Sequence, residues 1–229
     1  MKNKIITIDG PSGTGKSTVA KEVAKKLGFC YLDTGALYRG AALAIDLKGS
    51  NIDDDSRCRE ILSSTTIKLI KDKIFVNGKD VSSEIRSPRI SNLASRIAVH
   101  SSVREYLVEI QRSSSLSCSV VAEGRDTGSV VFPNADVKIY LDASLNERAR
   151  RRHKELISKG INIGFDQVLE EIQERDHRDK TRGVAPLVVS ENAIVVNTTQ
   201  MSIKEVISRV LKIIKDNLAF ASWDDGILE

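Results

Sequence analysis

The amino-acid sequence predicts an α/β fold in which a parallel sheet is flanked by helices. Five short apolar runs are typical of buried parallel strands, and they lie at residues 5–8, 29–32, 119–122, 137–141 and 194–196. Helical apolar periodicities lie between or after these runs, which is the alternation expected of β-α-β units. A glycine-rich loop follows the first run directly. A chain of 229 residues, 41% of them hydrophobic, is long enough to bury a sizeable core.

The loop after the first predicted strand has the sequence GPSGTGKS and fits the phosphate-binding pattern G-x-x-x-x-G-K-[ST]. Glycine lets successive backbone N–H groups point inward at phosphate oxygens, and the positive end of the next helix points there too. Lys16 would supply an ammonium group for the β- and γ-phosphates, and Ser17 a hydroxyl ligand for Mg²⁺. The strand before the loop and the helix after it, which Gly28 closes, favour a nucleoside triphosphate site over a plain turn. The residues expected to bind the triphosphate are Gly10, Pro11, Ser12, Gly13, Thr14, Gly15, Lys16, Ser17 and Thr18.

After residue 46 the alternation of strands and helices breaks. Residues 65–83 are typical of short antiparallel strands, with Asn77 and Gly78 as the favoured pair for a two-residue hairpin turn. A helix then begins with Ser87 as its N-cap and Pro88 in its first turn. We therefore predict a subdomain inserted into the core, with residues 51–96 in the insert and residues 1–50 and 97–229 in the core.

Composition and cysteine usage narrow the class of protein. The net charge of +4 suits small anionic substrates and is too low to indicate nucleic acid. Cys30 and Cys118 lie in apolar runs and have no metal-ligand spacing, so we interpret them as small buried hydrophobic residues. We find no secretory leader and no apolar stretch of about 18 residues that would span a membrane. A reducing cytoplasm is the default expectation. We make no prediction for the tail beyond Leu218, which contains Trp223.

Polar and charged residues gather after the predicted strands, where open parallel sheets bind their ligands. The second strand leads into LDTGALYR and the third into AEGRDTGSVVFP. Two later predicted helices contain NERARRRHKELISKG and FDQVLEEIQERDHRDKTR. The arginines of these segments therefore collect at loops and helix ends, as expected for a site that binds phosphate groups.

Taken together, these segments resemble the bacterial cytidylate kinases, a family of nucleoside monophosphate kinases. The resemblance spans nearly the whole chain and is carried by IDGPSGTGKST, YLDTGALYR, EGRDTGSVVFPNADVKIYLDAS, ERDHRDKTR followed by APL, and the hairpin-bearing insert. It implies one kinase domain over residues 1–229, with a P-loop NTPase core and a five-stranded parallel sheet. It also implies that the insert binds the nucleoside monophosphate and that residues 147–164 form a short helical lid.

The resemblance also implies the reaction and its partners. The γ-phosphoryl group of ATP would pass to CMP or dCMP, with Mg²⁺ as the cofactor. The enzyme would be a cytoplasmic monomer with no nucleic-acid or membrane partner. The nucleophile is a phosphate oxygen that is already anionic at neutral pH, so no general base is required. Catalysis would consist of positioning two polyanions and neutralising the transferring group.

The residues that would bind CMP follow from the same resemblance. The phosphate would be bound by Arg39, Arg125 and Arg182, and the ribose by Arg175 and Asp179. The cytosine edge would be read by Ser95, Arg104 and Asp126. The body of the acceptor would lie beside Thr34 and Tyr38. Planar guanidinium groups suit phosphate because they bind its oxygens bidentately. Thr34 stands where the family more often has Ser, which keeps the hydroxyl. Ser95 and Arg104 would also fit an ordinary helix surface.

On the donor side, the resemblance places Arg148, Arg151 and Arg152 in the lid over the triphosphate. A run such as RARRRHK is usually a solvated helix face, so some of these arginines would point away from ATP. Glu123 ends a predicted strand, where it would orient the Mg²⁺ waters or cap the following loop. The residues expected to act in catalysis are Lys16, Arg125, Arg148, Arg151 and Arg182.

Three other classes of protein fit the sequence less well. A hydroxyl kinase of the shikimate or gluconate type shares the loop, but needs a base or an orienting carboxylate and has no use for the insert. A regulatory GTPase needs an N-K-x-D tetrapeptide, which the sequence lacks. A nucleic-acid-binding role would depend only on RARRRHK, which has no interleaved aromatic residues.

Overall fold

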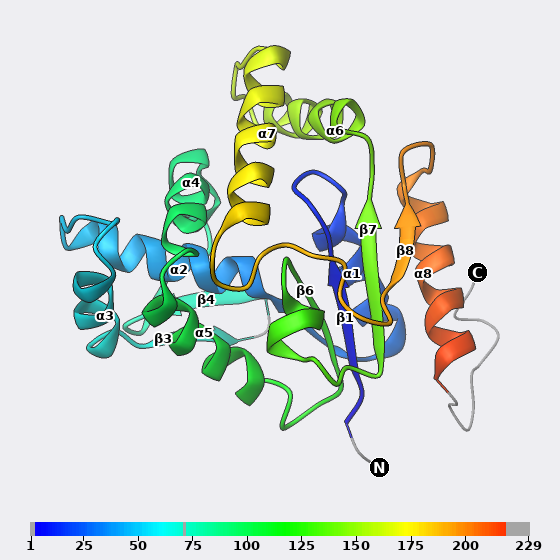
Figure 1. The fold of residues 1–229 in the computed structure, drawn as a ribbon, viewed down its shortest axis with the longest axis horizontal. Coiled ribbons are helices and arrows are strands. Elements are labelled where there is room, and N and C mark those ends of the chain that lie inside the picture. Colours follow the sequence, from blue (N-terminus) through cyan, green and yellow to red (C-terminus); the bar gives the residue numbers. More distant parts are fainter. Residues whose placement is uncertain (1–2, 71, 219–229) are drawn as a thin grey trace.

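The computed structural model describes residues 3–70 and 72–218 and confirms the predicted α/β fold (Figure 1). The main sheet has five strands in the order β2-β6-β1-β7-β8, and every pairing within it is parallel. The strands are β1 (Ile5–Asp9), β2 (Cys30–Asp33), β6 (Val120–Gly124), β7 (Val137–Asp142) and β8 (Ile194–Asn197), which match the five apolar runs. Trp223 and the rest of the tail after Leu218 lie outside the described residues.

Helices cover both faces of this sheet. Strand β6 shows why, because Val121 belongs to one buried cluster whereas its neighbours Val120 and Ala122 belong to another. Residues that alternate along a strand point to opposite faces, so a strand with apolar residues on both faces needs cover on both. The first cluster contains side chains of α1 (Lys16–Leu27) and α8 (Ile203–Asn217), and the second those of α2 (Thr34–Leu47) and α5 (Ser101–Ser113).

The insert packs against α2 and contains the predicted antiparallel hairpin. Its sheet has the strands β3 (Ile67–Ile70), β4 (Lys73–Val76) and β5 (Lys79–Asp80), in that order. Asn77 and Gly78 form the turn between β4 and β5 with φ angles of 48° and 81°, which is the left-handed backbone that an Asn-Gly turn requires. Helix α4 (Pro88–Ile97) begins as predicted, because the Ser87 hydroxyl accepts a hydrogen bond from the Ile90 backbone at 3.3 Å. Helix α3 (Asp55–Ser63) was not predicted.

Helices α6 (Leu145–Ser158) and α7 (Phe165–Thr181) form a hairpin beyond the carboxyl ends of the strands (Figure 1). A small core of its own holds the hairpin together, with buried Ala149 and Leu156 from α6 and Val168 and Ile172 from α7. The predicted helical lid therefore consists of most of α6 and the connection to α7. The predicted end of the lid at residue 164 lies immediately before α7.

The interpretation of two cysteines as buried hydrophobic residues is wrong. Cys30 is exposed at the start of β2, Cys118 is half-buried just before β6, and a disulfide bond joins them. Because β2 and β6 are neighbours in the sheet, their amino ends bring the two cysteines together, with 6.3 Å between the Cα atoms. Cys58 is the one free cysteine among the described residues, and it is buried.

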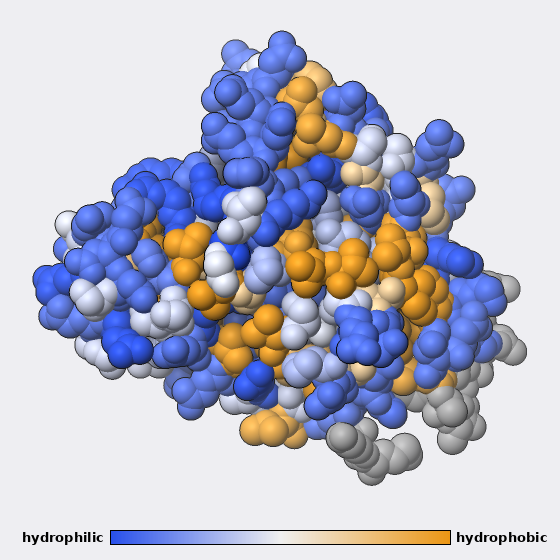
Figure 2. Space-filling view, in the orientation of Figure 1, coloured by the Kyte–Doolittle hydropathy of each residue, from blue (hydrophilic) through white to orange (hydrophobic). Residues whose placement is uncertain are grey.

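The outer surface is mixed in character. Hydrophilic side chains cover most of the face seen in Figure 2, and apolar side chains gather near its centre. Several exposed valines, Val184, Val188 and Val189, belong to the connection between α7 and β8. Within residues 3–70 and 72–218, no helix is long and apolar enough to cross a membrane.

Candidate active site

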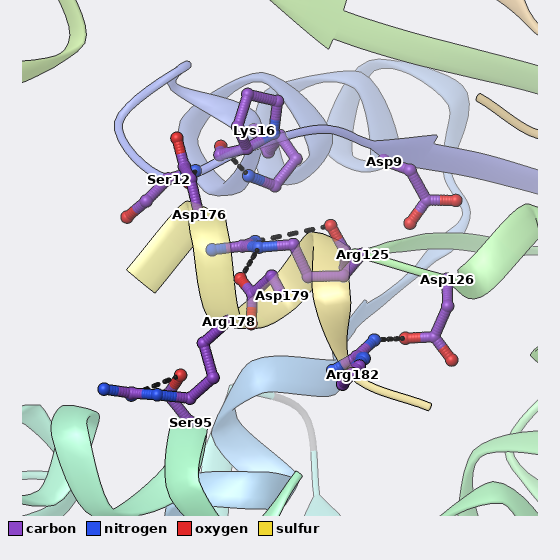
Figure 3. Close-up of polar contacts among 12 residues, drawn as sticks. Asp9, Ser12, Lys16, Ser95, Arg125, Asp126, Asp176, Arg178, Asp179 and Arg182 are labelled. Carbon is purple, nitrogen blue, oxygen red and sulfur yellow. Dashed lines mark hydrogen bonds and ion pairs between the residues drawn. The ribbon is translucent and has the colours of Figure 1, made fainter. Parts of the chain in front are cut away.

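A cleft of about 350 Å³ lies at the carboxyl ends of the strands. The phosphate-binding loop and the start of α1 form one side of it, and α2 and α4 form the other. The residues that follow β6 and the inner sides of α6 and α7 complete its lining. Ligands of open parallel sheets bind at this edge, and Figure 3 shows the polar side chains that the elements bring together here.

The phosphate-binding loop has the predicted backbone. Gly13 and Gly15 adopt φ angles of 80° and 90°, and a Cβ on Gly13 would lie 2.8 Å from the carbonyl oxygen of Arg148. Lys16 extends back over the loop, where its Nζ donates a hydrogen bond to the carbonyl oxygen of Pro11 at 2.7 Å. Burial, together with the charge of Arg125, lowers the pKa of Lys16 to about 7. Without a bound anion, therefore, this ammonium group is poorly stabilised.

The two residues predicted to bind Mg²⁺ meet, although 106 positions separate them. The Ser17 hydroxyl donates to Oε1 of Glu123 at 2.6 Å, and the Tyr31 hydroxyl lies 3.4 Å from the same oxygen. Burial raises the pKa of Glu123, and the neighbouring carboxylate of Asp33 raises it further. One hydroxyl and one carboxylate fit Mg²⁺, which keeps several waters and takes the remaining ligands from substrate phosphates.

Each arginine predicted to hold the CMP phosphate is bound to a carboxylate. The three pairs are Arg39 Nη2 with Asp33 Oδ2 at 3.0 Å, Arg125 Nε with Asp179 Oδ2 at 2.9 Å, and Arg182 Nη2 with Asp126 Oδ1 at 3.0 Å. All three guanidinium groups line the cleft. Asp33 also caps α2 and binds Arg86 of the insert at 3.3 Å, so it connects the insert to the core. Sequence analysis did not single out Asp33 or Arg86, although Asp33 begins the segment DTGALYR.

Two of the three residues predicted to read the cytosine base, Arg104 and Asp126, form one buried group. Asp126 is bound by Arg104 as well as by Arg182. The Arg104 guanidinium also lies over the Tyr38 ring, 5.6 Å from its centroid. The hydroxyl oxygen of Tyr38 is buried at the cleft and has no hydrogen-bond partner among the residues that the structure describes. A buried polar atom without a partner is costly, so this hydroxyl is available to a ligand. Thr34 lines the same cleft, but its hydroxyl donates to the Glu123 carbonyl oxygen at 2.7 Å.

Helix α7 supplies further predicted contacts to the cleft. Arg175 lies in the cleft wall, and its buried Nε has no partner among the described residues. Burial, with the charge of Arg125, lowers the pKa of Arg175 to about 10. Arg178, which the sequence analysis missed, donates from Nη1 to the Ser95 hydroxyl at 3.0 Å (Figure 3). This contact joins α7 to α4, and only the fold brings the two residues together.

The arginines of α6 lie differently from the prediction. Arg148 is buried beneath the phosphate-binding loop, and Arg151 is bound to Glu147 and to the Thr198 carbonyl oxygen at 2.6 Å. Neither residue lines the cleft, so this structure does not bring them into the position expected for catalysis. Arg152 does line the cleft. The reason is that the first turn of α6 rests directly on the loop, which leaves only residues further along the helix free to face the cleft.

Two buried aspartates at this edge were also missed. Asp9, at the end of β1, accepts hydrogen bonds from the Thr127 backbone, the Thr127 hydroxyl and the Gly128 backbone at 2.7–3.0 Å. It thereby fixes the segment that follows Asp126. Asp176 binds Arg148 and the loop residue Ser12. The signal in the sequence was weak, because each is a single carboxylate within an already assigned segment.

Comparison with known proteins places the chain in a family. The family model described as cytidylate kinase matches residues 6–216. The cytidylate kinase of Carboxydothermus hydrogenoformans is 46% identical over 213 residues, which cover 91% of this chain and 96% of that protein. The cytidylate kinase of Pasteurella multocida is 45% identical, with coverage of 95% and 98%. A crystal structure of an uncharacterized protein from Eubacterium ventriosum shares the fold, with a TM-score of 0.52 and 13% identity over 94% of this chain and 99% of that one. The chain belongs to the cytidylate kinase family.

Proposed function

We propose that this protein transfers the γ-phosphoryl group of ATP to CMP, and also to dCMP, giving ADP and the corresponding diphosphate. Support comes from the cytidylate kinase relatives, which are 45–46% identical over more than nine tenths of the chain. The observation that carries the proposal is the composition of the cleft. Its lining includes a phosphate-binding loop and also three guanidinium groups suited to a second phosphate, those of Arg39, Arg125 and Arg182.

On the donor side, the loop N–H groups and Lys16 would bind the triphosphate. Ser17 and Glu123 would hold Mg²⁺ with its waters, and the ion would screen charge on the transferring phosphoryl group. Arg152 is the arginine of α6 that faces the cleft, so it replaces Arg148 and Arg151 as the residue that would close over ATP. Closure of the proposed lid, residues 147–164, would exclude water and suppress ATP hydrolysis.

On the acceptor side, a phosphate would take over the guanidinium groups of Arg39, Arg125 and Arg182. Two of their carboxylate partners, Asp179 and Asp126, would then be free to contact the nucleoside. Asp179 would turn to the ribose with Arg175, and Asp126 would accept a hydrogen bond from the cytosine amino group. The ion pairs present without substrate keep these buried charges compensated until CMP arrives.

The alternative is a small-molecule hydroxyl kinase of the shikimate or gluconate type. A neutral hydroxyl must lose its proton during transfer, so such an enzyme needs a carboxylate that is free to accept it. Among the described residues, four carboxylates line the cleft. Asp126 and Asp179 are bound to arginines, Glu155 is bound to Arg152 and Lys159, and Glu123 accepts a hydrogen bond from Ser17. The insert also contributes Ser95 to the cleft, which suits an acceptor as large as a nucleotide.

An ADP-release assay with ATP and Mg²⁺ tests this proposal against a panel of acceptors. The panel contains CMP, dCMP, UMP, AMP, dTMP and shikimate. We expect turnover with CMP and dCMP, weaker turnover with UMP, and none with shikimate. A panel without CMP turnover would overturn the proposal, and turnover with shikimate alone would favour the alternative.

The finer expectations on cofactor and location also belong to this proposal. Mg²⁺ would be required, and chelation with EDTA should stop turnover. We also propose that the protein acts as a cytoplasmic monomer, which gel filtration of the purified protein would test. In a reducing cytoplasm Cys30 and Cys118 would be held as thiols, and their disulfide bond would form when the protein is purified in air without a reductant.

A further inference from the structure

The peptide groups on the two sides of Ser12 are held by one buried ion pair. Asp176 of α7 accepts a hydrogen bond from the Ser12 backbone N–H at Oδ1, over 3.0 Å. Arg148 of α6 donates from Nη1 to the Ser12 carbonyl oxygen at 2.9 Å. The same guanidinium group binds Asp176 Oδ2, which closes a ring of hydrogen bonds around Ser12. Figure 3 shows Asp176 and Ser12 next to each other beside the loop.

The residues of this ring lie far apart in the sequence, and the side chains of the ion pair are shielded from water. The side chains of Arg148 and Asp176 are each only 8% exposed, and 164 positions separate Asp176 from Ser12. Arg148 is fixed further because its Nε donates to the Ala143 carbonyl oxygen at 3.0 Å. A charged pair in such surroundings interacts strongly and is costly to break. The position of Ser12 is therefore set by the hairpin of α6 and α7 rather than by the loop alone.

The same helix carries the groups that face the acceptor. Arg175 and Asp179 flank Asp176 along α7, and Arg182 follows at its end. Arg175, Asp179 and Arg182 line the cleft, whereas Asp176 points to the loop. One rigid helix thus touches the donor-binding loop through Asp176 and the acceptor site through its neighbours.

We propose that Asp176 is a positioning residue for the triphosphate site. Together with Arg148 it fixes the backbone on both sides of Ser12, so the loop N–H groups are already oriented when ATP arrives. The proposal deepens the proposed function, because it gives α7 a place in binding the donor as well as the acceptor. Neither side chain would touch the reacting atoms, so both would affect ATP binding only by holding the loop in position.

The first test is the variant Asp176→Asn, with the dissociation constant of Mg-ATP measured by calorimetry. The amide keeps an oxygen for the Ser12 N–H but removes the negative charge that holds Arg148. We expect ATP binding to weaken by about 10- to 100-fold, by analogy with the loss seen when a residue that orients the ligands of a metal site is removed. Glu174→Gln, an exposed change on the same helix, is the matched control and should leave the constant unchanged.

A double variant separates positioning from stability. Asp176→Asn leaves Arg148 buried without its counter-charge, so some loss of thermal stability is expected. Arg148→Met with Asp176→Leu removes both charges together, which restores much of the stability but leaves Ser12 without its two partners. We expect this double variant to melt above the single variant and still to bind ATP weakly.

If ATP binding recovers in the double variant along with stability, or if Asp176→Asn binds ATP like the wild type, Asp176 is a structural residue only and the proposal is wrong. The readout is ATP binding without any acceptor. Absence of CMP turnover in the wild type would therefore refute the proposed function and leave this test intact.

Discussion

The guanidinium group of Arg182 is bound to the carboxylate of Asp126, with 3.0 Å between Nη2 and Oδ1. The two residues come from different segments, α7 and the turn after β6, and 56 positions separate them. In the proposed function, one holds the phosphate of CMP and the other reads its base. Without substrate they are paired with each other, so binding of CMP would exchange the contact of Arg182 with Asp126 for one with the phosphate. Arg104, which also binds Asp126, would remain as the counter-charge of that carboxylate.

Replacing Lys16 by Ala should abolish turnover without unfolding the protein. The ammonium group stabilises charge on the transferring phosphoryl group, and loss of such a donor typically costs about 10²–10³ in kcat. The melting temperature should stay the same or rise, because burial disfavours the charged form of Lys16 in the free protein. Near-normal activity of the variant in the ADP-release assay would contradict the role of Lys16.

ATP binding should weaken as the pH rises above 7. The pKa of Lys16 is lowered to about 7 in the free protein, and a bound polyanion raises it again by stabilising the ammonium group. At a pH above the pKa of Lys16 in the free protein, the protein must therefore take up a proton when it binds ATP. Its affinity for ATP should then fall by up to about tenfold per pH unit. Calorimetry at about pH 8 in two buffers of different ionisation enthalpy measures this uptake. The Lys16→Ala variant should show none, and equal uptake in both proteins would assign the proton to another group.

Replacing Arg182 or Arg39 by Met should damage the use of CMP more than that of ATP. Each removes a guanidinium group from the acceptor side of the cleft, at a cost of roughly 2–5 kcal/mol in kcat/KM for CMP. The KM for ATP should change much less. Arg59→Met, which removes an exposed ion pair with Glu105 at the surface, is the control. Loss of ATP affinity with CMP affinity kept would move both arginines to the donor site.

Asp126→Asn should narrow the preference for CMP over UMP. A carboxylate accepts from the cytosine amino group but faces the uracil oxygen with like polarity, whereas an amide can donate to that oxygen. The variant also leaves Arg104 and Arg182 with a weaker partner, so the protein should be less stable. The ratio of kcat/KM for CMP to that for UMP does not depend on the folded fraction. An unchanged ratio would mean that Asp126 does not read the base.

Reducing the bond between Cys30 and Cys118 should lower stability and leave catalysis intact. The bond closes a loop of 88 positions, and such bonds typically contribute about 2–4 kcal/mol by restricting the unfolded chain. Both cysteines lie at the amino ends of their strands, away from the cleft. Thiol titration of the denatured, unreduced protein should therefore find Cys58 alone. Finding all three thiols, or a fall in kcat for CMP on reduction at a temperature where the protein stays folded, would contradict this prediction.

The sequence by itself determined the features that neighbouring residues define. The phosphate-binding loop, the Asn77-Gly78 turn and the Ser87 cap each depend on a few consecutive residues whose backbone preferences act locally. Likewise, the short apolar runs predicted the five strands, and the helical periodicities between or after them predicted the flanking helices. The pairing of Ser17 with Glu123 was also within reach, because parallel strands present their carboxyl ends at one edge.

Only the tertiary structure decided which distant side chains pair. Helical spacing alone leaves open whether Arg148 faces ATP or the loop. Its placement follows from the packing of α6 against Gly13. The same holds for Arg178 with Ser95, for Asp176 with Ser12, and for Cys30 with Cys118. Each pair is separated by more than 80 positions. Contacts at such separations arise from packing of whole elements, which no local preference encodes.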